Sequence, residues 1–376
     1  MRAAEVVIAL DQGSSSSRAA AFDARGRVVA RAQFPVKTFH PGEGLFEHDA
    51  LELARTQERA LDAVLDRLPR SARVAGLGIA CQRSTLVLWD RETGSPLCRA
   101  PSWQDGRAAA LTAPLQERQR DVHERTGLYL TPYYSAPKFR WLLDQVPAVR
   151  AAADSGRLMA APVASFLLWR LTRGTVYAVD PTLAQRTLLF NLRTFEWDAE
   201  LAKLFGVPAG ALPEVLPSAG SWGEIERKGR RIPVLAVAGD QQAAVLGLGG
   251  TAGRGAPGVG RGAPAVGRGA PAVGRGAPAV GSGVLNYGTG AFFLLDTGEA
   301  QHRVPGLLTS IACGKPGARP GFFLEGTVHS AGTSFAWLKG LGLLKDEKGI
   351  DAACRRSKSR ALALPALGGL GAPRWD

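Results

Sequence analysis

Acidic, hydroxyl and glycine residues that suit phosphate binding gather near the start of the sequence, at residues 11–18 (DQGSSSSR). Asp11 follows an apolar run typical of a strand, and a carboxylate at a strand end can hold a hydrated Mg²⁺ ion. Gly13 lets the backbone approach a ligand closely, while hydroxyl groups and a guanidinium supply donors for phosphate oxygens. The candidate phosphate ligands are Ser14, Ser15, Ser16 and Arg18. A serine-rich hairpin with solvated side chains explains this stretch equally well.

A second stretch of the same kind occurs at residues 284–298 (VLNYGTGAFFLLDTG). An apolar run enters a turn of Gly288, Thr289 and Gly290, and another apolar run leaves it. Two such hairpins suggest two related halves that face one nucleotide. This arrangement resembles the actin and hexokinase class of ATPases, whose two domains close over ATP.

Asp240 follows a strongly apolar stretch at residues 232–238 and precedes a predicted helix that starts near residue 243. A carboxylate between a strand and a helix lies at the carboxyl edge of a sheet, where ligands bind in α/β folds. The N-terminus of the helix favours its ionised form. Asp240 is therefore a candidate site residue, and a simple helix cap is the alternative.

Arg83 follows a predicted strand at residues 74–80, and Trp103 lies in a later loop. Arg83 is either a structural ion-pair partner or, beside Trp103, a ligand for the hydroxyl groups of a small polar substrate. An isolated tryptophan is more often a core residue.

The elements that position these residues follow from apolar spacing and turn residues. We expect strands at 6–8, 19–22, 28–29, 74–80, 85–89 and 232–238, and helices at 50–68, 139–143 and 162–172. We also expect an extended segment at 176–190 that is interrupted by Asp180-Pro181. Asp49 is the predicted cap of the first helix. Residues 321–337 read as strand, glycine turn and helix.

Composition bounds the class of protein. The chain has 376 residues and a formal charge of +13, with 45% hydrophobic residues. Because arginines are scattered among acids, we favour a basic solvated surface over nucleic-acid binding. Four Arg-Gly-Ala-Pro repeats at residues 254–281 predict a disordered basic linker. No apolar run is long enough for a membrane span, and dispersed cysteines without a secretory signal predict a cytoplasmic location.

Six segments in order resemble the FGGY carbohydrate kinases of the ribonuclease-H-like ATPase superfamily: DQGSSSSR, CQRSTLVLWDRETG, SWQD, TPYYS, GDQQAA and NYGTG. The resemblance implies a two-domain α/β fold of the actin/hexokinase type, with domains at residues 1–238 and 239–376 and an incomplete second domain. It also implies transfer of the γ-phosphoryl group of ATP, with Mg²⁺, to a hydroxyl of glycerol or a related polyol. The sequence does not decide between a monomer and a homo-oligomer.

The resemblance assigns a role to each matching residue. Asp240 is the implied catalytic base and Asp11 the Mg²⁺-associated carboxylate. The implied nucleotide ligands are Ser14, Ser15, Ser16, Arg18, Thr289 and Gly332. The implied polyol ligands are Arg83, Ser84, Trp103, Tyr133, Asp240 and Gln241.

The sequence departs from the family at three places. Ser84 stands where glycerol-phosphorylating members carry a glutamate, and Ala336 stands where they carry a nucleotide-contacting glutamine. The sequence also ends where the family continues with the adenine-binding stretch. The alternatives are therefore a kinase for another polyol or sugar and a non-catalytic relative that binds a polyol or a protein partner.

Overall fold

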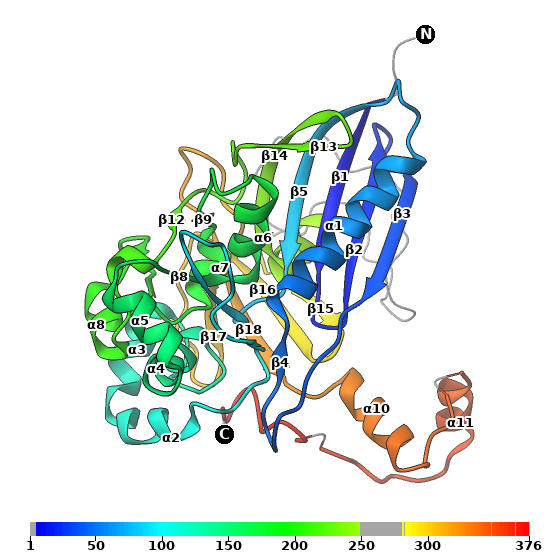
Figure 1. Cartoon of the computed structure of the whole chain (residues 1–376). Coiled ribbons are helices and arrows are strands. Elements are labelled where there is room, and N and C mark those ends of the chain that lie inside the picture. The colour runs from blue at the N-terminus through cyan, green and yellow to red at the C-terminus, as the bar shows by residue number, and fades with distance from the viewer. Residues whose placement is uncertain (1–4, 249–279, 282, 347, 365, 376) are drawn as a thin grey trace.

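The computed structural model describes residues 5–248, 280–281, 283–346, 348–364 and 366–375 (Figure 1). The predicted linker at residues 254–281 therefore lies almost wholly outside the described residues.

A six-stranded sheet forms the first half of the molecule, in the order β13-β14-β5-β1-β2-β3. Its strands are β1 (Glu5–Gln12), β2 (Ser16–Asp23), β3 (Val28–Pro35), β5 (Arg73–Cys81), β13 (Glu224–Arg227) and β14 (Arg230–Gly239). The central strands β14, β5 and β1 are parallel, whereas β13, β2 and β3 pair antiparallel with their neighbours. Residues alternate along β1, so that Val6, Ile8 and Leu10 are buried while Val7 is 49% exposed. The predicted strands of this half are confirmed.

Helix α1 (Ala50–Arg67) packs across β2 and β3 (Figure 1). Its N-terminus is closed by Asp49, whose carboxylate accepts hydrogen bonds from the backbone N–H groups of Leu51 at 2.8 Å and Glu52 at 3.2 Å. Both interactions satisfy donors that a helix start leaves free. The predicted cap is confirmed.

A four-stranded antiparallel sheet, in the order β15-β16-β18-β17, forms the second half. Its strands are β15 (Gly283–Tyr287), β16 (Ala291–Gly298), β17 (Leu308–Ile311) and β18 (Phe322–Val328). Val245 of helix α9 (Asp240–Gly247) packs with Val284, Phe292 and Leu294, so the helix after β14 joins the two sheets. The hairpin predicted around residues 288–290 is confirmed.

Four short strand pairs and further helices complete the described chain. The pairs are β4 (Glu47–His48) with β7 (Ala100–Pro101), β6 (Leu86–Asp90) with β8 (Leu158–Pro162), β9 (Ala178–Val179) with β12 (Glu214–Val215), and β10 (Phe190–Asn191) with β11 (Glu196–Trp197). The helices are α2 (Ala109–Thr112), α3 (Gln119–Thr126), α4 (Ser135–Gln145), α5 (Pro147–Asp154), α6 (Val163–Leu171), α7 (Pro181–Gln185), α8 (Ala199–Phe205), α10 (Gly332–Gly340) and α11 (Ile350–Arg356), with 3₁₀ turns at Ala113–Arg118 and Ala209–Ala211.

The predicted extended segment at residues 176–190 is interrupted at Asp180-Pro181, as expected, but the prediction is wrong for Pro181–Gln185, which form helix α7. The Asp180 carboxylate accepts hydrogen bonds from the N–H groups of Thr182 at 3.2 Å and Leu183 at 3.1 Å. Pro181 then occupies the first helical position, where a missing N–H costs nothing. The Asp-Pro pair therefore starts a helix here.

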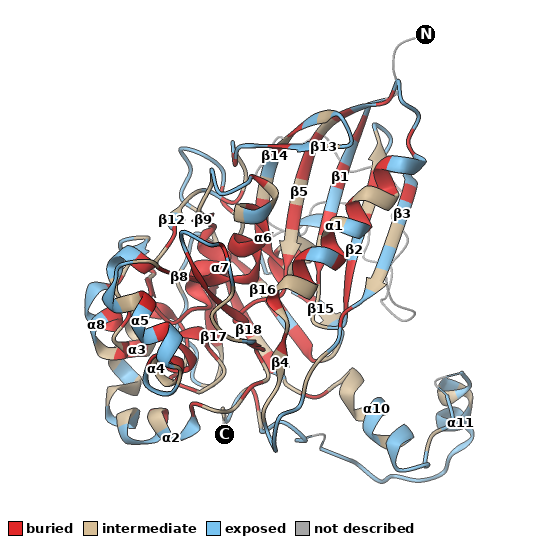
Figure 2. Cartoon of the chain, in the orientation of Figure 1, coloured by how far each residue is buried: buried red, intermediate tan, exposed pale blue. Residues whose placement is uncertain are grey.

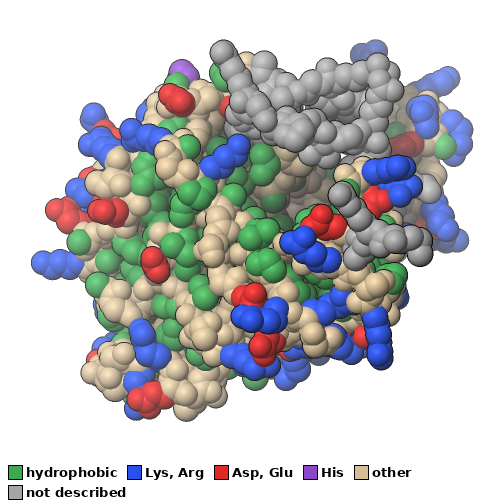
Figure 3. Space-filling model, turned by 90° about the horizontal axis from the view of Figure 1, so that it is seen from above, with side chains coloured by type: hydrophobic (Ala, Val, Ile, Leu, Met, Phe, Trp, Pro, Cys, Tyr) green, Lys and Arg blue, Asp and Glu red, His purple; other side chains and the backbone are tan. Residues whose placement is uncertain are grey.

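Buried residues concentrate where the helices meet the two sheets, whereas α10 and α11 extend away from the body (Figure 2). From above, basic, acidic and apolar side chains are interspersed on the visible face (Figure 3). Within the part of the chain that the structure describes, no helix has the length and apolar character required to cross a bilayer.

Candidate active site

The three parallel strands bring the candidate carboxylates to one edge of the first sheet. Asp11 of β1 lies beside Ala80 of β5, which in turn pairs with Ala238 of β14. Arg83 follows β5 and Asp240 follows β14, so all three charged residues lie at the carboxyl ends of neighbouring strands. Ligands bind at this edge in α/β sheets.

Asp240 is the first residue of α9, and the N-cap of this helix is Gly239. The alternative in which Asp240 only caps the helix is therefore wrong. Its Oδ1 atom accepts a hydrogen bond from the N–H of Gln241 at 2.8 Å and lies 3.8 Å from Nε of Arg83. Desolvation raises the pKa of Asp240 to about 6, Arg83 opposes the rise, and the charge of Asp11 adds to it. A carboxylate with this pKa is mostly ionised at neutral pH, and its pKa lies near the value that suits a general base.

Aromatic residues from both halves surround Arg83. The Trp103 ring, 7% exposed, contacts the Tyr133 ring edge-on at 5.6 Å and the Phe292 ring at 6.3 Å. The guanidinium of Arg83 lies 5.2 Å from the centre of the Phe292 ring, and Tyr133 stacks on His329 at 5.2 Å. The structure thus brings the predicted polyol ligands Arg83, Trp103 and Tyr133 together against the second sheet.

Gln241 and Ser84 lie beside this cluster. The Gln241 side chain is buried, and its Oε1 atom accepts a hydrogen bond from Nδ2 of Asn286 at 2.8 Å. Ser84 is fully buried and has a left-handed backbone with φ of 63°. Its Oγ atom has no hydrogen-bond partner among the described residues. A neutral hydroxyl therefore occupies the position next to Arg83.

Lys138 links the loops that carry the aromatic residues. Its fully buried ammonium donates to the backbone carbonyls of Ser102 at 2.6 Å, Trp103 at 3.3 Å and Tyr133 at 2.8 Å. Burial lowers the pKa of Lys138 to about 7, whereas three carbonyl acceptors favour the protonated form. The two loops are thereby held by one side chain of α4.

The loop of the first predicted phosphate site is shorter than expected. Ser14 is half-buried and Ser15 exposed, but Ser16 begins strand β2 and is 5% exposed. The expectation that Ser16 lies in the loop is therefore wrong, because its backbone pairs with Pro35 of β3. Arg18 also lies in β2 and forms an exposed ion pair with Asp11 at 2.9 Å.

The turn at residues 288–290, which is the second predicted phosphate site and is called here the second phosphate turn, is held by the start of α10. Gly332 donates its backbone N–H to the carbonyl oxygen of Gly288 at 3.0 Å, and Ala331 donates to Thr289 at 2.9 Å. A Cβ atom on Gly332 would lie 2.6 Å from the Gly288 oxygen, so this contact requires glycine. The structure thus brings the predicted nucleotide ligands Thr289 and Gly332 together.

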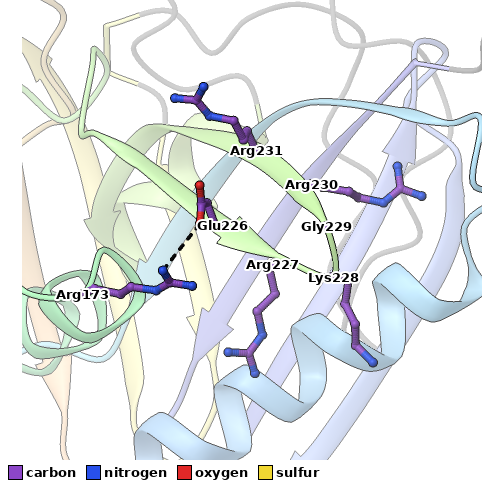
Figure 4. Close-up of a pocket in the computed structure, with 7 residues that line it drawn as sticks. All are labelled: Arg173, Glu226, Arg227, Lys228, Gly229, Arg230 and Arg231. Atoms are coloured by element: carbon purple, nitrogen blue, oxygen red, sulfur yellow. Dashed lines mark ion pairs between the residues drawn. The ribbon is translucent and has the colours of Figure 1, made fainter.

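A basic hollow of about 360 Å³ lies at the opposite end of β14, around the β13–β14 turn (Figure 4). Its cations already have protein partners. The pairs are Arg173 with Glu226 at 3.5 Å, Arg227 with Asp62 at 2.7 Å, Lys228 with Asp66 at 3.1 Å, Arg231 with Glu224 at 2.7 Å, and Arg230 with the Pro69 carbonyl at 3.0 Å. Because these charges are compensated, we place the candidate site at the carboxyl ends of the strands.

Sequence reasoning missed four residues that complete the site: Phe292, His329, Glu325 and Arg186. The fully buried Glu325 carboxylate accepts hydrogen bonds from Arg83 at 2.8 and 3.0 Å, and it also pairs with Arg186. A single acid inside the apolar run at residues 321–328 was the available signal for Glu325. Phe292 directly follows the second phosphate turn in the sequence.

The fold and the strand-end site together define a kinase of the two-domain ribonuclease-H-like ATPase type. The model of the FGGY family of carbohydrate kinases, N-terminal domain, matches residues 6–247, and the chain belongs to this family. The predicted fold class is thereby confirmed. The predicted domain boundary at residues 238/239 stays a prediction.

Curated relatives named glycerol kinase resemble almost the whole chain. The protein from Alcanivorax borkumensis is 40% identical over 98% of this chain and 70% of its own length. The protein from Thermus brockianus is 41% identical over 98% of this chain and 71% of its own length. The chain therefore spans about 70% of the length of these relatives.

Solved structures agree with this family assignment. The glycerol kinase of Plasmodium falciparum with ADP superimposes with a TM-score of 0.81 at 27% identity, over 99% of this chain and 71% of that one. The gluconate kinase of Lactobacillus acidophilus superimposes with a TM-score of 0.76 at 18% identity, over 100% and 71%, and supports the fold alone.

Proposed function

We propose that this chain transfers the γ-phosphoryl group of ATP to a primary hydroxyl of glycerol, giving glycerol 3-phosphate and ADP. The observation that carries the proposal is the identity of about 40% to proteins named glycerol kinase across nearly the whole chain. The grouping of Arg83, Trp103, Tyr133 and Asp240 at one strand edge supports the same activity.

In this proposal, Asp240 accepts the proton of the attacking hydroxyl while that oxygen forms its bond to the γ-phosphorus and ADP leaves. A pKa of about 6 keeps Asp240 ionised before the reaction. Arg83 and Gln241 supply hydrogen-bonding groups for the polyol hydroxyls, and the Trp103 and Phe292 rings cover its carbon chain. Tyr133, whose ring contacts that of Trp103, forms another wall of the proposed polyol site.

The phosphate chain of ATP would lie between the two hairpin turns. Ser14, Ser15 and Arg18 contact it from the first half, and Thr289 with the adjacent Gly332 contacts it from the second. Ser16 is buried in β2, so we assign it a role through its backbone only.

Asp11 fits a role beside Mg²⁺, which would neutralise phosphate charge when bound. Its carboxylate is 40% exposed and is engaged by an exposed arginine, and such a surface pair is weak enough to exchange for a metal. The described residues contain no cluster of three or more potential metal ligands. Mg²⁺ in kinases is commonly held by one or two carboxylates and the substrate phosphates, and Asp11 supplies one such carboxylate.

A kinase for another small polyol is the second candidate, because Ser84 places a neutral, fully buried hydroxyl next to Arg83. The test is turnover by the purified chain with ATP and Mg²⁺ against glycerol, longer polyols and sugars. Phosphorylation of glycerol with the highest kcat/KM supports the proposal. Preference for another substrate supports the second candidate, and absence of turnover with every substrate refutes both.

A further inference from the structure

Glu325 joins the two halves of the molecule through a buried charge cluster. It lies on β18 of the second sheet and is fully buried. Its carboxylate accepts hydrogen bonds from Nη1 and Nη2 of Arg83 at 3.0 and 2.8 Å and from Oγ of Ser310 at 2.8 Å, and it pairs with Arg186. Arg83 and Arg186 belong to the first half, while Glu325 and Ser310 belong to the second.

This bidentate contact fixes the plane of the Arg83 guanidinium. Nη1 also lies 3.4 Å from Oε1 of Gln242. The Nε–H and a second hydrogen on Nη2 are not used by Glu325 or Gln242. Nε lies 3.8 Å from Oδ1 of Asp240, which is longer than a hydrogen bond.

The separation between Arg83 and Asp240 matters for the proposed reaction. An arginine in direct contact with a carboxylate stabilises the ionised form and lowers its basicity. It would also occupy the oxygen that must accept the hydroxyl proton. A competing anion on the other side of the guanidinium prevents such a contact.

We propose that Glu325 is a positioning residue, whose charge holds Arg83 at a distance from Asp240 and thereby keeps the base free. Arg186 contributes by keeping Glu325 ionised. Although burial opposes ionisation, Arg186 and Arg83 hold the pKa of Glu325 at about 2. The effect on catalysis rests on the proposed function, whereas the effect on the Arg83 position does not.

The test compares Glu325→Gln, which keeps the shape but removes the charge, with Glu325→Asp, which shortens the side chain but keeps the charge. If charge holds Arg83, Glu325→Gln lowers kcat for the polyol by roughly 10²-fold, the usual cost of a misplacement of about 1 Å. KM for ATP should stay near the wild-type value, and Glu325→Asp should retain more activity than Glu325→Gln. Greater activity in Glu325→Gln than in Glu325→Asp would overturn the proposal.

Asp198→Asn is the matched control. Asp198 is another buried carboxylate, with its side chain 5% exposed and 3.1 Å from Nη1 of Arg125. The Asp198 carboxylate caps α8 and accepts hydrogen bonds from Arg125, Asn191 and the N–H groups of Glu200 and Leu201, not from Arg83 or Arg186. Its loss should therefore lower stability but leave kcat/KM near wild type. A similar loss of kcat/KM in this control would show that buried charges act only through stability.

A crystal structure of Glu325→Gln separates this inference from the proposed function. We expect Arg83 to move until one of its nitrogens lies within hydrogen-bond distance of Asp240. An unmoved Arg83 refutes the positioning role, even if the wild-type chain phosphorylates no polyol. If Glu325→Gln does not fold, Glu325→Asp, which keeps the charge, should still hold the Arg83 nitrogens beyond hydrogen-bond distance of Asp240. A direct hydrogen bond between Arg83 and Asp240 in that variant refutes the role of the charge.

Discussion

Two glycines of α10 offer a direct test of the second phosphate turn. A Cβ atom at position 332 would lie 2.6 Å from the backbone oxygen of Gly288, whereas at position 340 it would meet nothing within 4 Å. Gly332→Ala should therefore displace the turn, and Gly340→Ala should not. The two variants make the same chemical change in the same helix.

The expected size of the effect of Gly332→Ala on ATP binding follows from the steric overlap. Overpacking against backbone that cannot rotate away costs ~1–3 kcal/mol. If the displaced turn binds phosphate, that energy appears as a rise in KM for ATP of roughly 5- to 150-fold. KM for the polyol should change less than KM for ATP, because of its proposed ligands only Phe292 lies beside this turn, whereas Arg83, Trp103, Tyr133 and Asp240 belong to the first half. Gly340→Ala should instead leave stability unchanged or raise it by less than ~0.5 kcal/mol, since alanine is the better helix former but position 340 is the last residue of α10.

The assay is steady-state kinetics with each substrate varied in turn, together with urea unfolding of all three proteins. Equal KM values for ATP in wild type and Gly332→Ala would refute the placement of the nucleotide at this turn. Loss of ATP affinity in Gly340→Ala would show that the helix as a whole, rather than the Gly332 contact, is responsible.

Three further predictions concern the first half. Asp240→Asn should lower turnover by ~10²–10⁴-fold, and wild-type kcat/KM should fall about tenfold per pH unit below pH 6, where Asp240 becomes protonated. Because the pKa of Asp240 is raised from 3.8 to about 6 in the folded state, ionisation of Asp240 costs stability as the pH rises from about 4 to 6, and the full cost is present above pH 6. Asp240→Asn should therefore raise the melting temperature at pH 7, and a lower melting temperature would contradict this. Lys138→Met removes the ammonium donor from three backbone carbonyls, of which that of Ser102 still accepts from the N–H of Asp105, and should cost ~1–3 kcal/mol in urea unfolding, whereas the exposed Lys203→Met should cost less than ~0.5 kcal/mol. Ser84→Glu should improve kcat/KM for glycerol by roughly 10- to 150-fold if a charge-assisted hydrogen bond worth ~1.5–3 kcal/mol is restored, and a loss of glycerol turnover would place Ser84 outside the polyol pocket.

Local patterns predicted most of what lies within one strand or turn. Apolar runs ended by Asp11, Arg83 and Asp240 marked three strands, and the strands' parallel pairing brings these residues to one edge. Local sequence patterns also gave wrong predictions of secondary structure at two places. Four consecutive serines conceal the start of β2 at Ser16, and the predicted interruption at Asp180-Pro181 gives no sign that Pro181 begins helix α7.

Contacts between the two sheets were beyond local patterns. Phe292, Glu325 and His329 are distant in sequence from the Arg83, Trp103 and Tyr133 side chains that they meet. The spacing of residues 321–328 does not predict which arginine side chains pair with Glu325. Pairing across sheets depends on how the halves pack, and that information is spread over the whole core.

This packing couples the chemistry of the site to the contact between the halves. Asp240 is basic because it stands in a desolvated position whose nearest cation, Arg83, is compensated by another carboxylate. That carboxylate belongs to the second sheet, while Asp240 and Arg83 follow strands of the first. Any motion that separates Glu325 from Arg83 leaves a buried guanidinium whose nearest remaining anion is Asp240, and the base would then be drawn into an ion pair. In the proposed mechanism, a closed arrangement of the two halves therefore serves both to bring the two proposed phosphate turns together and to keep the proposed base free.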